Sequence, residues 1–227
     1  MGTLAHVFEA RGISTIVLAS MRPVVEKLHP PRALYCEFPL GRPLGKPGDI
    51  GFQHDVLSRA FALLAEESGP VLVDHPEVIE ESSQALTCAM PARFDPSLPA
   101  CIDEANGIRR AYDRELAARG VTSVGRVVDV DGIPTALQAF QQIADGADWK
   151  AVDLPGGNTI QAVHDIRAYY EEASIQLVDG PPPGGRAAEA WFYEDTEAGH
   201  TVMAARNAIK DSGGPFPVWF YMAPGHR

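Results

Sequence analysis

The sequence predicts an α/β fold, Rossmann-like and layered, with a mostly parallel sheet and helices on both of its faces. Short apolar, β-branched runs alternate with longer segments of helical periodicity, as in 14–19, then 23–27, and later 52–67. Glycine and proline stand at the ends of these segments, which is typical of parallel strands connected by helices. The 227 residues are enough for one α/β domain over 1–227 with a full core.

The first half of the predicted domain is residues 1–75. Residues 3–10 have the character of a helix that stops at Gly12, and S-T-I-V-L-A at 14–19 has that of a buried parallel strand. Apolar side chains recur on one face of 52–67, as expected of an amphipathic helix. Two further strands are predicted at 33–38 and 71–73.

The second half, 76–227, contains Pro/Gly-rich loops at 91–99 and 179–186 and no internal repeat. Helices are predicted at 77–86, 103–119, 134–144, 159–173 and 200–210. Strands are predicted at 122–130, 149–154, 175–178, 191–193 and 218–222. Ligands of parallel sheets lie beyond the carboxyl ends of the strands. That rule selects four loops, 39–49, 74–77, 129–134 and 155–159.

Composition excludes several functional classes. The net charge of −11 argues against a nucleic-acid or anionic membrane surface. Three widely spaced cysteines without a C-x-x-C pair form neither a disulfide framework nor a zinc ribbon. The sequence has no apolar run of about 18 residues and no basic start followed by an apolar core. A cytoplasmic protein is therefore expected.

Residues 9–64, about a quarter of the chain, contain glycine and proline residues in an unusual order. The segments are Gly12-Ile13-Ser14-Thr15, Pro23-Val24-Val25, Pro31-Arg32-Ala33, Pro39-Leu40-Gly41, Gly45-Lys46-Pro47 and a helix ending Leu63-Leu64. This order resembles the C-terminal part of the B-type subunits of glycine, sarcosine, betaine and D-proline reductases. The resemblance implies thiol-driven reductive cleavage of a bond next to a carboxylate or activated carbonyl.

This sequence differs from the family in one important respect. In that family a selenocysteine or cysteine motif lies just upstream of the helix that feeds the first strand, and here that helix is 3–10, directly after Met1. Cys36 falls on the second strand, where a core role is expected. The motif has no position in this sequence. A truncated start, a companion subunit that carries the motif, or loss of the reductive chemistry would each account for this.

The loop 39–49 places Arg42 and Lys46 among glycines and prolines, including Gly41 and Gly45. A guanidinium fork binds both oxygens of a carboxylate. The loop is therefore a candidate site for a small carboxylate substrate, and a rigid crossover or a subunit contact is the alternative.

Asp74, His75 and Glu77 follow the strand at 71–73 and could provide a base oriented by a carboxylate. A metal there would need a further ligand, such as Glu80 or His164, so metal binding is left open. A surface turn is the more common meaning of such a cluster.

Three weaker candidates lie in the second half. Gly156, Gly157 and Asn158 precede a predicted helix and could bind an anion, or Asn158 or Thr159 could cap the helix. Cys88 and Cys101 flank the proline-rich segment and are candidate thiols, although buried, inert cysteines are more common. The pair Asp129 and Asp131 only weakly suggests magnesium and phosphoryl chemistry.

The leading hypothesis is a subunit of a thiol-dependent reductase complex that acts on a small carboxylate, with Arg42 and Lys46 orienting the substrate. The redox-active cysteine or selenocysteine would come from a companion subunit or from an upstream segment, and an oligomer is expected. The alternatives are a hydrolase or lyase using Asp74, His75 and Glu77, with or without a metal, and a non-catalytic partner subunit. The sequence identifies neither the cofactor nor the electron donor.

Overall fold

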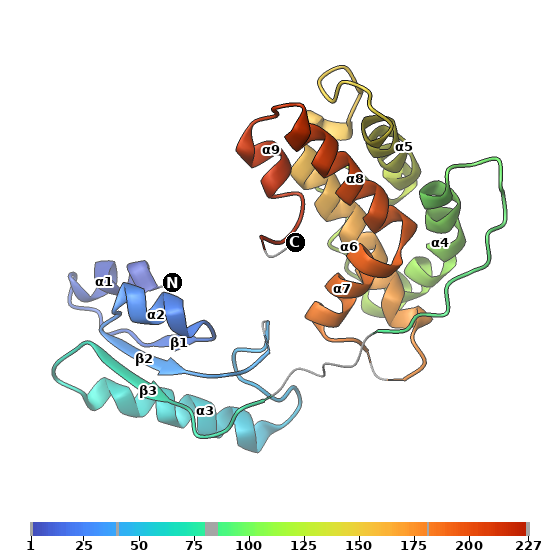
Figure 1. The fold of residues 1–227 in the computed structure, drawn as a ribbon. Coiled ribbons are helices and arrows are strands. Elements are labelled where there is room, and N and C mark those ends of the chain that lie inside the picture. The colour runs from blue at the N-terminus through green and yellow to red at the C-terminus, as the bar shows by residue number, and fades with distance from the viewer. Residues whose placement is uncertain (1, 40, 80–85, 181, 226–227) are drawn as a thin grey trace. The chain divides into compact units, whose positions relative to one another are not determined.

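A computed structural model describes residues 2–39, 41–79, 86–180 and 182–225 (Figure 1). Contacts divide the chain into two compact units, unit 1 over Met1–Ser82 and unit 2 over Ser83–Arg227. The sequence predicts one α/β domain over 1–227, whereas the contacts divide the chain into these two units. Parallel strands occur in unit 1, and unit 2 is built from helices.

Unit 1 contains a three-stranded parallel sheet in the order β1-β2-β3. The strands are β1 Val17–Ala19, β2 Arg32–Tyr35 and β3 Val71–Asp74, close to the predicted positions. The helices are α1 Gly2–Glu9, α2 Arg22–Leu28 and α3 Ile50–Ala62, and α3 continues into the short 3-10 helix η1 Leu63–Ala65.

Alternation along β2 gives the sheet two buried faces. Leu34 packs with Val56 of α3 in one cluster, whereas Ala33 packs with Val25 of α2 in another. Helix α3 therefore covers one face and α2 the other, as Figure 1 shows. This small layered sheet brings the loops that follow β2 and β3 to one edge.

Unit 2 is a bundle of helices around one large apolar core. Its elements are α4 Ala100–Arg119, η2 Val130–Gly132, α5 Ile133–Ala144, η3 Pro155–Gly157, α6 Thr159–Leu177, α7 Gly185–Asp195, α8 Glu197–Asp211 and α9 Phe216–Phe220. Helix α6 packs on α4, and α5 packs on α8. None of the helices in the described ranges is both long and apolar enough to cross a membrane.

The strands predicted in the second half are wrong. Residues 175–177 belong to α6 and 191–193 to α7, while 218–220 lie in α9. Residues 149–152 form a turn in which the Asp148 carbonyl accepts the N–H groups of Ala151 and Val152. The segment 124–128 is irregular because side-chain oxygens, rather than a neighbouring strand, accept its backbone N–H groups: the Thr122 hydroxyl accepts that of Val124, and the Asp165 carboxylate accepts those of 125–128.

That irregular run is held by one buried aspartate. The Asp165 carboxylate is fully buried in α6 and accepts N–H groups from Gly125 and Arg126 on Oδ1, both at 3.0 Å. Its Oδ2 accepts those of Val127 and Val128 at 2.8 and 2.9 Å. The four bonds lower the pKa of Asp165 below the ordinary value, although its burial acts in the opposite direction and is the largest single influence.

Of the predicted helix at 77–86, residues 80–85 lie outside the described residues and 77–79 are not helical. The predicted helices at 103–119, 134–144, 159–173 and 200–210 are confirmed as parts of α4, α5, α6 and α8.

Candidate functional site

The carboxyl edge of the unit 1 sheet gathers most of the candidate residues. The loop 39–49 leaves β2, the central strand, and runs into α3, while 75–79 follow β3. The N–H of Ile79 donates to the carbonyl of Glu37, just before the loop, at 3.0 Å, and Lys46 of the loop forms an ion pair with Glu77. The structure thus places these two predicted loops side by side.

Asp74 and His75 do not act together, because successive side chains of a strand point to opposite faces. Asp74 forms an ion pair with Arg22 at the start of α2. The Arg22 guanidinium also lies 4.3 Å from the centre of the Tyr35 ring. Asp74 is therefore part of the contact between α2 and the sheet.

His75 turns to the α3 face, and its side chain has 0% exposure. Its ring packs against Phe38 and Phe52, at centroid distances of 5.2 and 5.5 Å. Nδ1 lies 3.2 Å from both the N–H nitrogen and the carbonyl oxygen of Glu77, and Nε2 lies 3.3 Å from Oδ2 of Asp55. Both ring nitrogens are engaged, and this geometry gives His75 a packing role.

Asp55 is the partner of His75 that sequence reasoning missed. It lies on α3, twenty residues before His75, and also pairs with Arg59 one turn later. The Arg59 hydrogen bond is the main influence that lowers the pKa of Asp55. A carboxylate on a facing helix gives no local signal in the sequence near His75.

Glu77 forms an ion pair with Lys46 of the Pro/Gly loop at 3.2 Å. The Lys46 ammonium also lies 4.4 Å from the centre of the Phe52 ring. Lys46 is thus held against α3 and β3. Arg42 differs, because it is exposed and its side chain has no hydrogen bond or ion pair within the part of the chain that the structure describes.

Two glycines shape this loop. Gly45 has φ +77°, and a Cβ there would lie 2.3 Å from the Phe52 ring and 2.7 Å from Ile79. Gly41 has φ +85° with open space around it, so only its backbone conformation favours glycine. The loop therefore packs tightly at Gly45 and is open near Arg42.

The motif residues Thr15 and Arg32 meet at the opposite, amino edge of the sheet. Glu9 Oε1 accepts the N–H and hydroxyl of Thr15 at 2.6 and 3.0 Å and a guanidinium N–H of Arg32 at 2.8 Å. Arg32 also donates twice to the carbonyl of Glu66. These motif residues join α1, β2 and the end of η1, so their role here is structural.

In unit 2, Asn158 caps α6 by accepting the N–H of Gln161 at 3.0 Å, as one of the two sequence interpretations expects. Gly156 and Gly157 have φ +66° and +61°, and a Cβ on Gly156 would strike Val127. A cavity of about 280 Å³ lies beside this turn, with Lys150 among its lining residues. The capping bond accounts for the Asn158 side chain without a ligand.

The three cysteines lie in different surroundings, and burial raises the pKa of each thiol. The pKa is about 11 for both Cys36 and Cys88, with Asp195 adding to the effect at Cys88. Cys101 is buried in the unit 2 core and its pKa is also raised. A thiol with a raised pKa has little thiolate at neutral pH and is a weak nucleophile.

Within the described residues, no group of three His, Cys, Asp or Glu side chains could hold a metal ion. Glu80 lies outside those residues, and His164 belongs to unit 2. Asp129 accepts the N–H of Gly132, and Asp131 forms an ion pair with Arg109. The two carboxylates therefore have different partners and do not form a shared site.

Comparison with protein-family models, curated proteins and solved structures gives no match for this chain.

Proposed function

We propose that the chain is a subunit of a thiol-dependent reductase complex, similar to the B-type component of glycine and D-proline reductases, and that unit 1 orients a small carboxylate substrate. The observation that carries the proposal is Arg42. It is an exposed guanidinium, without a partner in the described ranges, on a Pro/Gly loop at the carboxyl edge of a parallel sheet. We further propose that the sheet of unit 1 is Rossmann-like and that its ligand binds at the carboxyl ends of the strands.

Arg42 is the substrate-orienting residue in this proposal, and Lys46 supports the loop. Lys46 already pairs with Glu77, which leaves Arg42 to provide the two parallel N–H donors that fit a carboxylate. Arg22, Asp55 and Asp74 are also paired at this edge, and their contacts hold the helices to the sheet.

The nucleophile of the proposed reaction comes from a companion subunit. The raised pKa values of all three thiols make each of them a poor nucleophile at neutral pH. In the reaction, the bond between the α-carbon and its leaving group breaks, and the carbon gains hydrogen. The leaving group takes the second proton, and two electrons come from a dithiol that becomes a disulfide.

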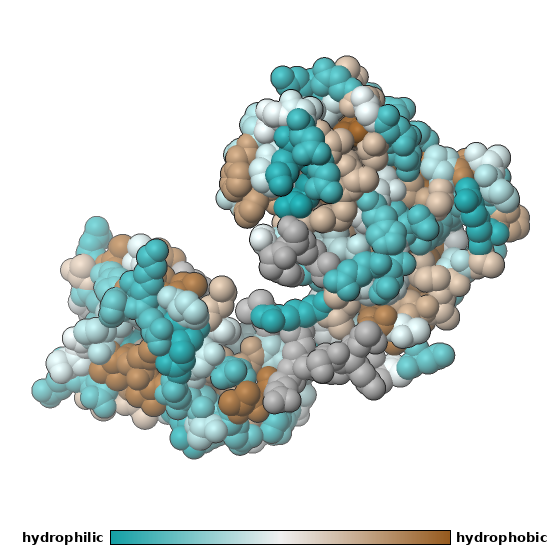
Figure 2. Space-filling model, viewed as in Figure 1, coloured by the Kyte–Doolittle hydropathy of each residue, from teal (hydrophilic) through white to brown (hydrophobic). Residues whose placement is uncertain are grey.

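Unit 1 has surface suited to a companion. Leu72 and Val73 of the edge strand β3 are 36% and 41% exposed, and Phe61 of α3 is 62% exposed. Figure 2 shows hydrophobic surface on unit 1, the body on the left. An edge strand with apolar side chains favours association with another chain, which is also what the third alternative, a non-catalytic partner subunit, requires.

The test is reduction assayed with a companion chain. The protein is coexpressed with a neighbouring gene product that carries a cysteine or selenocysteine motif, and dithiol-dependent cleavage of glycine, sarcosine, betaine and D-proline is measured. We expect activity only with both chains, retained when Cys36, Cys88 and Cys101 are all replaced by Ser. Activity that needs one of these cysteines would contradict the companion-thiol proposal, and a non-catalytic subunit would leave activity unchanged in Arg42→Gln.

A further inference from the structure

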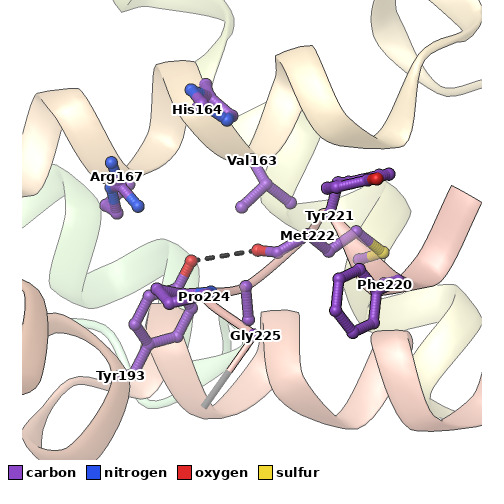
Figure 3. Close-up of a pocket in the computed structure, with 10 residues that line it drawn as sticks. Val163, His164, Arg167, Tyr193, Phe220, Tyr221, Met222, Pro224 and Gly225 are labelled. Carbon is purple, nitrogen blue, oxygen red and sulfur yellow. Dashed lines mark hydrogen bonds between the residues drawn. The ribbon is translucent and has the colours of Figure 1, made fainter. Parts of the chain in front are cut away.

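Unit 2 contains a cavity of about 240 Å³ (Figure 3). Its lining residues lie between 163 and 225 in the sequence, whereas the loop that carries Arg42 belongs to unit 1. Helix α6 contributes Val163, His164 and Arg167, and Tyr193 of α7 and the segment after α9 form the other walls. The Tyr193 hydroxyl donates to the carbonyl of Met222 at 2.9 Å, which fixes that segment against α7. The remaining lining residues are Phe220, Tyr221, Ala223, Pro224 and Gly225.

The lining combines an apolar wall with basic side chains. Phe220, Tyr221 and Val163 supply aromatic and branched surface, while Arg167 supplies a guanidinium and His164 an imidazole. No carboxylate is among the lining residues that the structure describes, in a chain whose net charge is −11. Such a cavity favours an organic anion over a cation or a polar neutral molecule.

Arg167 is held in place by two glutamates that lie outside the lining. Its Nε is 3.2 Å from Glu171 one turn later on α6, and Nη1 is 3.9 Å from Glu189 of α7. The side chain keeps 27% exposure. The contact with Glu189 is too long for a hydrogen bond, and Arg167 also hydrogen-bonds to Tyr193 of the cavity wall. Since a guanidinium has five N–H donors, Arg167 retains donors for a ligand.

His164 is oriented by a second arginine. Nη1 of Arg126 lies 3.2 Å from Nδ1 of His164, and since a guanidinium only donates, the neutral ring carries its proton on Nε2. Burial, followed by the charges of Arg167 and Arg126, lowers the pKa of His164, with Asp165 acting in the opposite direction. The ring is neutral at pH 7, and an anion placed nearby would favour its protonation.

We propose that this cavity binds a small carboxylate with an aromatic side group, the carboxylate toward Arg167 and His164 and the ring against Val163, Phe220 and Tyr221. A dry cavity of roughly 150 Å³ is enough to admit benzene. The volume of about 240 Å³ therefore has room for one ring and a short acid chain. The site is separate from the Arg42 loop and does not depend on the proposed reductase function.

The test is calorimetric titration of the full chain with 3-phenylpropionate and, for comparison, its neutral amide. We expect saturable binding of the acid, and binding at least tenfold weaker for the amide and for the acid with Arg167→Gln. Arg109→Gln is the matched control, because Arg109 also pairs with two carboxylates in unit 2 but does not line the cavity. Its affinity should equal that of the wild type.

A second variant covers the outcome in which Arg167→Gln fails to fold. Tyr221 is 55% exposed, so Tyr221→Ala should fold normally and bind the acid at least threefold more weakly. Absence of saturable binding, equal affinity for the amide, or unchanged affinity in Tyr221→Ala would overturn the proposal. A loss in Arg109→Gln as large as that in Arg167→Gln would overturn it as well, since the effect would then be general electrostatics.

Discussion

Replacing Asp165 with asparagine should strongly destabilise unit 2. The carboxylate is fully buried, and each of its oxygens accepts two backbone N–H groups from 125–128. An asparagine keeps one acceptor oxygen and turns an NH₂ group toward the other two donors. Two hydrogen bonds to a charged acceptor are lost and two buried N–H groups face a donor.

The size of this effect follows from the number of lost bonds. A hydrogen bond to a charged group contributes about 1.5–3 kcal/mol, so two of them give a loss of about 3–6 kcal/mol. The total free energy of unfolding of a domain is about 5–15 kcal/mol. Asp165→Asn should therefore remove a large share of the stability of unit 2.

Urea unfolding followed by tryptophan fluorescence measures this loss in the right unit, because Trp149, Trp191 and Trp219 all belong to unit 2. Asp113→Asn is the control, since Asp113 is half exposed and forms a surface ion pair with Arg109, so the loss of stability should stay below about 1 kcal/mol. A loss below about 1 kcal/mol for Asp165→Asn would refute the account of the 125–128 run.

The pH dependence of the stability of unit 2 checks the role of Asp165 independently. The pKa of Asp165 is lowered in the folded protein, so its contribution to stability is present above the ordinary aspartate value and is lost as pH falls through the lowered pKa. Asp165→Asn should remove this part of the acid sensitivity. An acid-unfolding profile identical to that of the wild type would contradict the assignment.

Three further predictions concern unit 1 and the thiols. Gly45→Val should destabilise unit 1, seen as faster hydrogen exchange, far more than Gly48→Val, which has the same φ of +77° but open space around it; equal effects would remove the packing argument. His75→Ala should cost about 2–4 kcal/mol by leaving a cavity beside α3, and unchanged exchange in α3 would argue against its packing role. Alkylation of Cys88 should be slow at pH 7 and rise with pH toward its pKa of about 11; rapid reaction at pH 7 would show an activated thiol.

The sequence predicts unit 1 well because its signals are local. The predicted strands at 14–19, 33–38 and 71–73 are largely apolar runs with glycine or proline close to their ends, and each has a counterpart in the sheet. The pairing of Asp55 with His75 could not be predicted in this way. It depends on how α3 packs against the sheet, and on strand alternation turning Asp74 to the other face.

Unit 2 shows why an apolar run alone does not identify a strand. Trp191, Phe192 and Tyr193 have high strand propensity, yet all three are buried within α7. Burial of three successive helical residues requires neighbours on several sides, and that is a tertiary property. The 125–128 run likewise takes its hydrogen bonds from Asp165, some forty residues later in the chain.

The most direct test of the central claim is an NMR titration of the ¹⁵N-labelled full chain with glycine, betaine and D-proline. The account predicts saturable shifts in the amides of 41–49 that disappear in Arg42→Gln. They should persist in Arg11→Gln, an exposed arginine on the turn after α1 that precedes β1. Shifts confined to other regions, or the same shifts in Arg42→Gln, would contradict the assignment of the Arg42 loop as the carboxylate site.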